Sequence, residues 1–207
     1  MKSLFKSFIF GSLLALAGAA FAQEAPDALI ERLSRQVIET AKTDASIQGG
    51  DRKRIQEVVE KNVLPHIDFQ RTTALAVGRH WREATPEQRQ QLSNEFLKLL
   101  MYTYSGAMAQ IKDQKLEVRP LRANPADDDV IVRSQVLRPR AEPVEVNYRM
   151  VKSPDGWKIY DVSVLGAWLV ETYKSSFATE IGKSGIDGLI KTLSERNQKL
   201  AAATARG

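Results

Sequence analysis

Residues 129–165 read DVIVRSQVLRPRAEPVEVNYRMVKSPDGWKIYDVSVL, and apolar and polar side chains alternate along much of this stretch. A period of two residues is typical of antiparallel strands that bury one face. A tight turn is favoured at Ser153-Pro154-Asp155-Gly156, because proline presets the backbone angle and glycine relieves the end of the turn. The apolar face of residues 143–151 consists of Val144, Val146, Tyr148 and Met150.

Four strands are expected in this region and just before it. They span residues 115–120, 129–137, 143–151 and 157–165. Val130, Val132 and Val136 share one face of the second strand, with Ser134 between them. Because consecutive strands are joined by short loops, the sequence predicts an antiparallel meander.

Along the chain, helical patterns both precede and follow the predicted sheet. Apolar residues recur at helical spacing in residues 26–43, and again from Asp51 until Pro65 ends the pattern. A third helix begins at Thr85-Pro86-Glu87, since a hydroxyl N-cap, a proline in the first position and an acid in the first turn all favour a helix start. It should run to about Ile111.

Two more helices are predicted after the sheet, one following Gly166 and the other following Gly185. Helices gathered on one side of an antiparallel sheet define the α+β class. We therefore expect an antiparallel four-stranded sheet packed against a helical layer.

The N-terminal segment has the features of a cleavable secretory signal. Lys2 and Lys6 precede a short apolar run from Phe8 to Ala17, and the small-x-small tripeptide Ala20-Phe21-Ala22 follows it. The run is shorter than the ~20 residues that span a bilayer, which favours cleavage over a retained anchor. We therefore expect a signal peptide at residues 1–22, a single domain at 23–200 and a disordered tail at 201–207.

Composition excludes several classes of function. The full chain carries a net charge of +5, and because residues 1–22 contain two lysines and no acid, the mature chain carries +3. So small an excess gives no case for nucleic-acid binding. With no Cys and only two His, the chain offers no thiol chemistry and few ligands for soft metals.

No sequence motif indicates an enzyme. The chain has no Gly-x-Ser-x-Gly elbow, no phosphate-binding glycine-rich loop and no His-Glu-x-x-His zinc motif. His66 and His80 lack partners in a catalytic motif and are expected to be structural. The alternative is a hydrolase in which Asp68 and Asp161 form a carboxylate pair, although the former fits a helix N-cap and the latter a hydrogen-bonding strand residue.

Aromatic and methionine side chains recur on elements that are expected to face one another. Tyrosine and tryptophan are amphipathic and methionine is pliable, so such a set suits either a packed core or a ligand cavity. Periodicity favours the core, and composition leaves both interpretations open. The residues are Trp81, Tyr104, Met108, Tyr148, Met150, Trp168 and Tyr173.

Three blocks in order along the chain carry a further signal. The first is VLPHIDF at residues 63–69 with VGRHWR at 77–82, the second is ATPEQR at 84–89 with YTY at 102–104, and the third is WKIYDV at 157–162 with GIDGL at 185–189. Together they resemble the MlaC family of periplasmic phospholipid-carrier proteins, also known as toluene-tolerance auxiliary proteins. Trp168 departs from the family pattern, which has a serine two residues after Gly166.

The resemblance implies a carrier that encloses the acyl chains of a phospholipid in an apolar pocket between the sheet and the helices, with the head group at the mouth in water. The implied function is to shuttle lipid between an outer-membrane lipoprotein–porin complex and an inner-membrane ABC transporter with an MCE-domain ring. Such shuttling maintains outer-membrane lipid asymmetry. The resemblance further implies a periplasmic monomer with no cofactor and no catalytic activity.

Candidate lipid-binding residues come from the inward faces of the predicted elements. A register error of one residue would exchange the two faces of a strand, so the set depends on the assigned faces. The alternative function is a periplasmic, non-enzymatic binding or adaptor module without lipid cargo, in which the same residues only fill the core. The candidates are Phe69, Leu100, Tyr104, Met108, Val132, Val146, Tyr148, Val162, Val164, Trp168, Leu169 and Tyr173.

Overall fold

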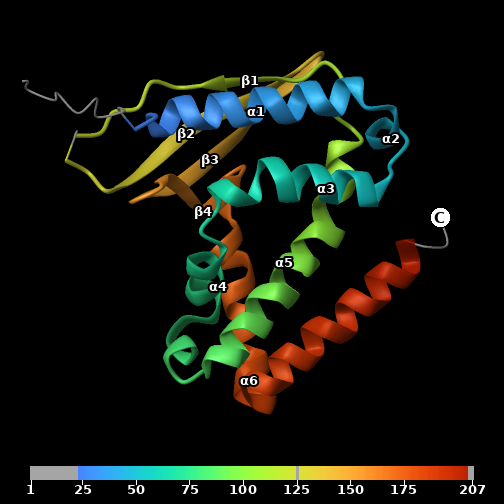
Figure 1. The fold of residues 1–207 in the computed structure, drawn as a ribbon, viewed down its shortest axis with the longest axis vertical. Coiled ribbons are helices and arrows are strands. Elements are labelled where there is room, and N and C mark those ends of the chain that lie inside the picture. Colours follow the sequence, from blue (N-terminus) through green and yellow to red (C-terminus); the bar gives the residue numbers. More distant parts are fainter. Residues whose placement is uncertain (1–22, 125, 205–207) are drawn as a thin grey trace, which may run out of the picture.

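The computed structural model describes residues 23–124 and 126–204. They form an α+β fold in which an antiparallel sheet lies above a helical body (Figure 1). The predicted signal peptide, residues 1–22, lies outside the described residues. In chain order the elements are α1 (Pro26–Thr43), α2 (Ala45–Gln48), α3 (Arg52–Asn62), η1 (Leu64–His66), α4 (Phe69–Val77), η2 (Gly78–Arg82), α5 (Pro86–Met108), β1 (Lys115–Val118), β2 (Asp129–Arg138), β3 (Ala141–Ser153), β4 (Gly156–Val164), β5 (Ala167–Trp168) and α6 (Leu169–Thr204).

The sheet has five antiparallel strands in the order β1-β2-β3-β4-β5, one more than the four predicted. The four longer strands overlap the predicted segments, with β3 two residues longer at each end than predicted, and their antiparallel order confirms the meander. The fifth, β5, is only two residues long and too short to show a period. It folds back on β4 through a tight turn at Leu165 and Gly166, whose φ angles are 52° and 84°.

Strand register gathers the apolar side chains of the sheet on one face. Val132 of β2 lies opposite Tyr148 of β3, which lies opposite Val162 of β4. Farther along, the pairing of β3 with β4 shifts, so that Tyr160 is an extra residue in β4. A bulge of this kind bends a strand and ends its regular alternation. Up to the bulge, the faces assigned from the sequence are those of the structure.

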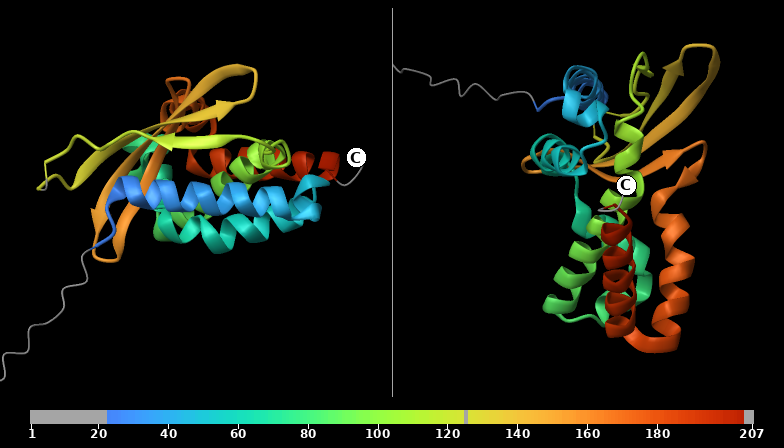
Figure 2. Two further views of the ribbon diagram at one scale, coloured as in Figure 1. Left: turned by 90° about the horizontal axis from the view of Figure 1, so that it is seen from above. Right: turned by 90° about the vertical axis from the view of Figure 1, so that its right-hand side faces the viewer.

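The helix α1 packs against this apolar face, and α3 runs beside α1 (Figures 1 and 2). Apolar residues of α1 recur every three or four positions, so they form one stripe of the helix. Leu29, Ile30 and Leu33 from this stripe are buried. They share a cluster with strand residues that include Val130 and Met150.

The helices α4, α5 and α6 form a second body below the sheet (Figure 1). Gly185, with φ of 72°, divides α6 into two arms that run in opposite directions (Figure 2). Glycine takes this backbone conformation without the steric cost of a Cβ. The two helices predicted after Gly166 and Gly185 are therefore present, joined by a sharp turn.

The ends of α5 and α6 show how local chemistry sets helix length. At the start of α5, the backbone N–H of Gln88 donates to Thr85 Oγ1 and the Gln88 side chain accepts from the Thr85 N–H, which confirms the predicted cap. The helix ends at Met108 and not at Ile111, because i→i+3 hydrogen bonds tighten the chain there.

At the C-terminus, α6 continues through Thr204, so part of the predicted disordered tail is helical. Alanine, which fills most of residues 201–204, is the strongest helix former.

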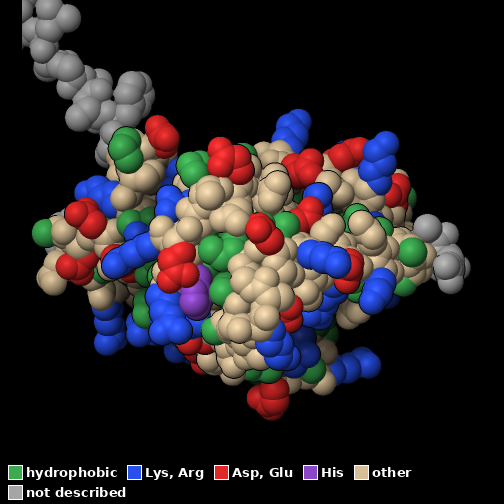
Figure 3. Space-filling model, turned by 90° about the horizontal axis from the view of Figure 1, so that it is seen from below, with side chains coloured by type: hydrophobic (Ala, Val, Ile, Leu, Met, Phe, Trp, Pro, Cys, Tyr) green, Lys and Arg blue, Asp and Glu red, His purple; other side chains and the backbone are tan. Residues whose placement is uncertain are grey.

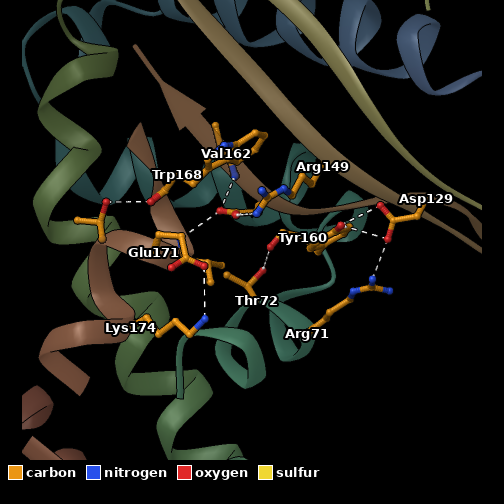
Figure 4. Close-up of polar contacts among 12 residues, drawn as sticks. Arg71, Thr72, Asp129, Arg149, Tyr160, Val162, Trp168, Glu171 and Lys174 are labelled. Atoms are coloured by element: carbon orange, nitrogen blue, oxygen red, sulfur yellow. Dashed lines mark hydrogen bonds and ion pairs between the residues drawn. The ribbon is translucent and has the colours of Figure 1, made fainter. Parts of the chain in front are cut away.

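Asp161 connects the sheet to α6, and its side chain is fully buried. Its Oδ1 accepts hydrogen bonds from the backbone N–H groups of Val162 and Val170, at 3.0 and 3.1 Å. Its Oδ2 accepts from Nη1 of Arg149 at 3.0 Å (Figure 4). Burial raises the pKa of the Asp161 carboxyl, while the Val170 amide and the Arg149 charge oppose the increase. The carboxylate thus takes the place of an N-cap side chain for α6, which begins at Leu169.

A second polar group attaches α4 to the sheet (Figure 4). Tyr160 donates from its hydroxyl to Asp129 at 2.8 Å, and Arg71 pairs with the same carboxylate at 2.8 Å. The Arg71 guanidinium also lies 4.1 Å from the centre of the Tyr160 ring. Thr72 donates from Oγ1 to the Tyr160 carbonyl at 2.8 Å. These contacts fix the helical body against β4.

Replacing Asp161 by asparagine tests its role in joining the two bodies. The variant Asp161→Asn keeps one acceptor but places an NH2 group against Arg149. Breaking a buried ion pair often costs more, but Arg149 is 32% exposed and can turn to water, so we expect the unfolding free energy to fall by about 1–2 kcal/mol. Urea denaturation measures this value. The control is Asp155→Asn in the exposed β3–β4 turn, and an equal loss in both variants would contradict the role.

Candidate functional site

An open apolar groove of about 490 Å³ lies between α1, the end of α5 and the sheet. Concave sites of 300–1,000 Å³ with mostly apolar walls are typical of small-molecule binding. Each wall comes from a different part of the chain, so the groove exists only in the folded protein. The apolar residues that line it are Ile30, Leu33, Val37, Ile38, Val63, Ala107, Met108, Ile111, Leu116, Val136, Val144, Tyr148 and Ile159.

Periodicity explains why these side chains point into the groove. In α1, Leu33 and Val37 are four residues apart and Ile38 follows on the same stripe. In the sheet, Val136 lies opposite Val144, and both share a face with Tyr148. Helix and strand therefore present apolar stripes that face each other, and the groove is the part of this contact that the stripes do not fill.

The floor of the groove contains a hydroxyl cluster around Tyr148. Ser34 of α1 and Ser134 of β2 lie near the Tyr148 hydroxyl, and Ser134 Oγ donates to the Val146 carbonyl at 2.7 Å. Burial raises the pKa of Tyr148, and the two serines oppose the increase. The cluster brings hydroxyl groups of α1, β2 and β3 together without placing a charge among the apolar walls.

One end of the groove is polar. Gln110 and Gln114, from the turn between α5 and β1, lie there with Arg138 at the end of β2. The opposite end is closed by core residues, because Ile30 and Ile159 are 1% and 5% exposed. The groove is therefore asymmetric, with buried apolar side chains at one end and polar side chains at the other.

Only Met108 and Tyr148 of the predicted lipid-binding residues line this groove. Val132 and Val162 share its face of the sheet but pack in the core under α1. Val146 is half-buried on the same face. These residues thus lie on the predicted apolar face of the sheet, but the groove occupies only one part of that face.

The remaining predicted residues lie elsewhere. Four belong to the core of the helical body or pack against it: Phe69, Leu100, Leu169 and Tyr173. Tyr104 and Val164 are about half exposed, at 50% and 49%. Trp168 lies beneath the Arg149 guanidinium, 4.0 Å from the ring centre, which gives this departure from the family pattern a packing role.

Sequence reasoning missed the groove residues of α1, namely Leu33, Val37 and Ile38. Their helical period was visible in the sequence, but a stripe that fills a core and a stripe that lines a groove have the same period. Two missed strand residues, Val136 and Val144, could have been identified from the alternation of the strands. They form one pair on the face of Tyr148, four residues farther along the same ladder.

The described residues show no arrangement typical of catalysis. Asp68 accepts from the Arg71 N–H at 3.0 Å and caps α4, whereas Asp161 binds Arg149 and the start of α6. His80 pairs with Glu83 at 2.9 Å, and burial lowers the pKa of His66. Within residues 23–124 and 126–204, no group of three His, Cys, Asp or Glu could hold a metal ion.

The distribution of charged side chains on the lower face of the molecule fits the small net charge. Seen from below, acidic and basic side chains are interspersed, and hydrophobic side chains reach the surface only in small patches (Figure 3). In the part of the chain that the structure describes, no helix is long and apolar enough to cross a membrane.

Three comparisons relate the chain to known proteins. The family described as MlaC protein matches residues 31–195. A phospholipid-binding protein from Ralstonia solanacearum, solved in complex with a phospholipid, is 44% identical, with a TM-score of 0.81 over 84% of this chain and 98% of that chain. The intermembrane phospholipid transport system binding protein MlaC of Haemophilus influenzae is 19% identical over 85% of this chain and 84% of its own length. Toluene tolerance protein ttg2D of Pseudomonas putida is 28% identical over 56% of this chain and 53% of its own length.

Proposed function

The chain belongs to the MlaC family, and from this we propose that it is a phospholipid carrier of the periplasm that holds acyl chains in the apolar groove between α1, α5 and the sheet. The observation that carries the proposal is the groove itself, whose walls are mostly apolar and whose two amide side chains and one charged side chain lie at one end. A diacyl phospholipid has the same asymmetry. The bound phospholipid of the Ralstonia solanacearum protein supports the same ligand class.

The physical chemistry of lipid transfer explains why such a groove is sufficient. Two acyl chains contain roughly 30 methylenes, and each costs about 0.8 kcal/mol in water, so unaided passage costs on the order of 20–25 kcal/mol. Transfer from a bilayer into an apolar groove exchanges one apolar medium for another and is nearly neutral. The carrier therefore needs no catalytic group and no energy source of its own.

The proposed partners are the two membrane complexes of the transport route. The carrier would exchange phospholipid with an outer-membrane lipoprotein–porin complex and with an inner-membrane ABC transporter that has an MCE-domain ring. Shuttling between them would maintain outer-membrane lipid asymmetry. The interspersed surface charges suit transient docking, since rim charges set association rates more than affinity (Figure 3).

A transfer assay tests carriage directly. Donor vesicles contain fluorescent phospholipid, acceptor vesicles contain the reconstituted ABC transporter complex, and lipid-free protein is added between them. The proposal predicts transfer that rises in proportion to the protein concentration and falls when the transporter is omitted. Transfer at the rate measured without the protein would contradict the proposal.

Removing the bound lipid should lower the stability of the protein. A ligand that binds only the folded state adds about 2.7 kcal/mol at a free concentration of 100 times its Kd. For a chain of this size, that corresponds to roughly 5–11 °C in Tm. Thermal unfolding of delipidated protein, before and after incubation with phospholipid vesicles, measures the difference. Identical melting temperatures would count against a lipid in the groove.

A further inference from the structure

Among the residues that the structure describes, Arg138 is the only charged one that lines the apolar groove. It is the last residue of β2, at the polar end of the groove, and the register of β1 with β2 places it beside Gln114. Every other lining residue is apolar or uncharged. Because Arg138 is exposed, its charge stays hydrated at the edge of the apolar cavity and can be reached by a ligand.

The Arg138 guanidinium is held in position by its own hairpin. Both Nε and Nη2 donate to the carbonyl oxygen of Glu142, at 3.1 and 2.7 Å. In the described residues no carboxylate comes within ion-pair distance of this side chain. The charge is thus oriented but not neutralised, and the remaining N–H donors are available to a ligand.

The shape of the groove fixes which part of an amphiphile meets this charge. The far end is closed by Ile30 and Ile159, so apolar chains enter from the polar end and point toward these residues. The polar part of the ligand must then stay at the open end, near Arg138 and Gln110. Arginine binds phosphate oxygens through two parallel N–H donors, which gives both strength and orientation.

We infer that Arg138 binds the phosphodiester of the lipid whose acyl chains occupy the groove, and that this contact makes the protein select phospholipids over diacyl lipids without phosphate. The inference rests on the proposed function and adds a specificity residue to it. The head group is then anchored at the mouth through one oriented charge and is not left free in water.

A competition experiment tests the selectivity. Delipidated protein is incubated with vesicles that contain equal amounts of phosphatidylethanolamine and diacylglycerol with identical acyl chains, and native mass spectrometry measures the two complexes. Charge-assisted hydrogen bonds at a partly exposed site predict about a tenfold preference for the phospholipid in the wild type. In Arg138→Gln the preference should vanish, and in Arg138→Lys it should be intermediate, because charge remains without the fork.

The matched control is Arg133→Gln, which removes the same charge from the same strand but from the opposite face of the sheet. It should keep the full preference. Unchanged selectivity in Arg138→Gln, or an equal loss in both variants, would overturn the inference. If the wild type bound both lipids equally, only the inference would fail, whereas binding of neither lipid would overturn the proposed function itself.

A further arm separates the lipid phosphate from free phosphate. Millimolar inorganic phosphate is added to the competition with wild-type protein. The lipid preference should persist, because the acyl chains hold the phosphodiester at Arg138 at a high effective concentration. Loss of the preference under these conditions would show that the site binds free phosphate and would contradict the lipid assignment.

Discussion

Val37→Asp is expected to abolish phospholipid binding while the protein stays folded. Val37 lies on α1, is half-buried and lines the groove. Acyl chains packed against an ionised carboxylate would strip it of water without a partner, which costs several kcal/mol. Affinity for lipid should fall by at least about 100-fold, measured by native mass spectrometry after incubation with vesicles. Leu116→Asp, in β1 on the facing wall, should have the same effect.

The control for this prediction is Val164→Asp. Val164 was predicted from the sequence to contact lipid, but the structure exposes 49% of it at the end of β4, outside the groove. The same chemical change should therefore leave lipid binding within about twofold of the wild type, since the added carboxylate stays in water. Circular dichroism checks that each variant is folded. Lipid retained in Val37→Asp, or lost equally in Val164→Asp, would contradict the placement of the site.

Phe96→Ala is expected to cause the largest loss of stability. Phe96 of α5 is fully buried at the centre of the helical body. Its ring centre lies 5.5 Å from that of Phe69, 4.9 Å from that of Tyr173 and 5.0 Å from that of Phe177. Truncation removes the apolar contacts of three aromatic partners and leaves a cavity, so the unfolding free energy should fall by about 3–5 kcal/mol.

Urea denaturation of lipid-free protein measures this loss without a contribution from bound ligand. Leu75→Ala is the control, because Leu75 is on the neighbouring α4 but is 40% exposed. Its loss should be well below half of that for Phe96→Ala, since less apolar area leaves water. Comparable losses in the two variants would show that the ring cluster is not the centre of the helical core.

Most of the fold follows from the sequence because its elements carry strong local signals. The helix at Pro26–Thr43 has the predicted bounds, with proline in its first turn and a clear apolar stripe. In the strand Ala141–Ser153, apolar and polar side chains alternate from Val144 to Met150. The two-residue β5 was missed because its existence depends on the turn at Leu165-Gly166 and on pairing with β4, not on any period.

The candidate site was harder to predict. The alternation of apolar and polar residues shows which face of a strand is apolar, but it does not show which helix packs on that face. Val146 and Val164 lie opposite each other on the face that also carries Tyr148. Only Tyr148 reaches the groove, because α1 and the end of α5 cover one part of the sheet and leave Val164 open to solvent. The path of a helix over a sheet is set by tertiary packing, which no local pattern of either element contains.

Native mass spectrometry of the mature protein, followed by organic extraction and lipid analysis, shows whether the protein carries a phospholipid. The protein is purified without detergent so that no amphiphile replaces a bound ligand. We expect a bound mass equal to that of a diacyl phospholipid, and recovery of that phospholipid in the extract. A lipid-free mass, with no uptake after incubation with phospholipid vesicles, would contradict phospholipid carriage and favour a binding or adaptor module whose apolar faces only fill the core.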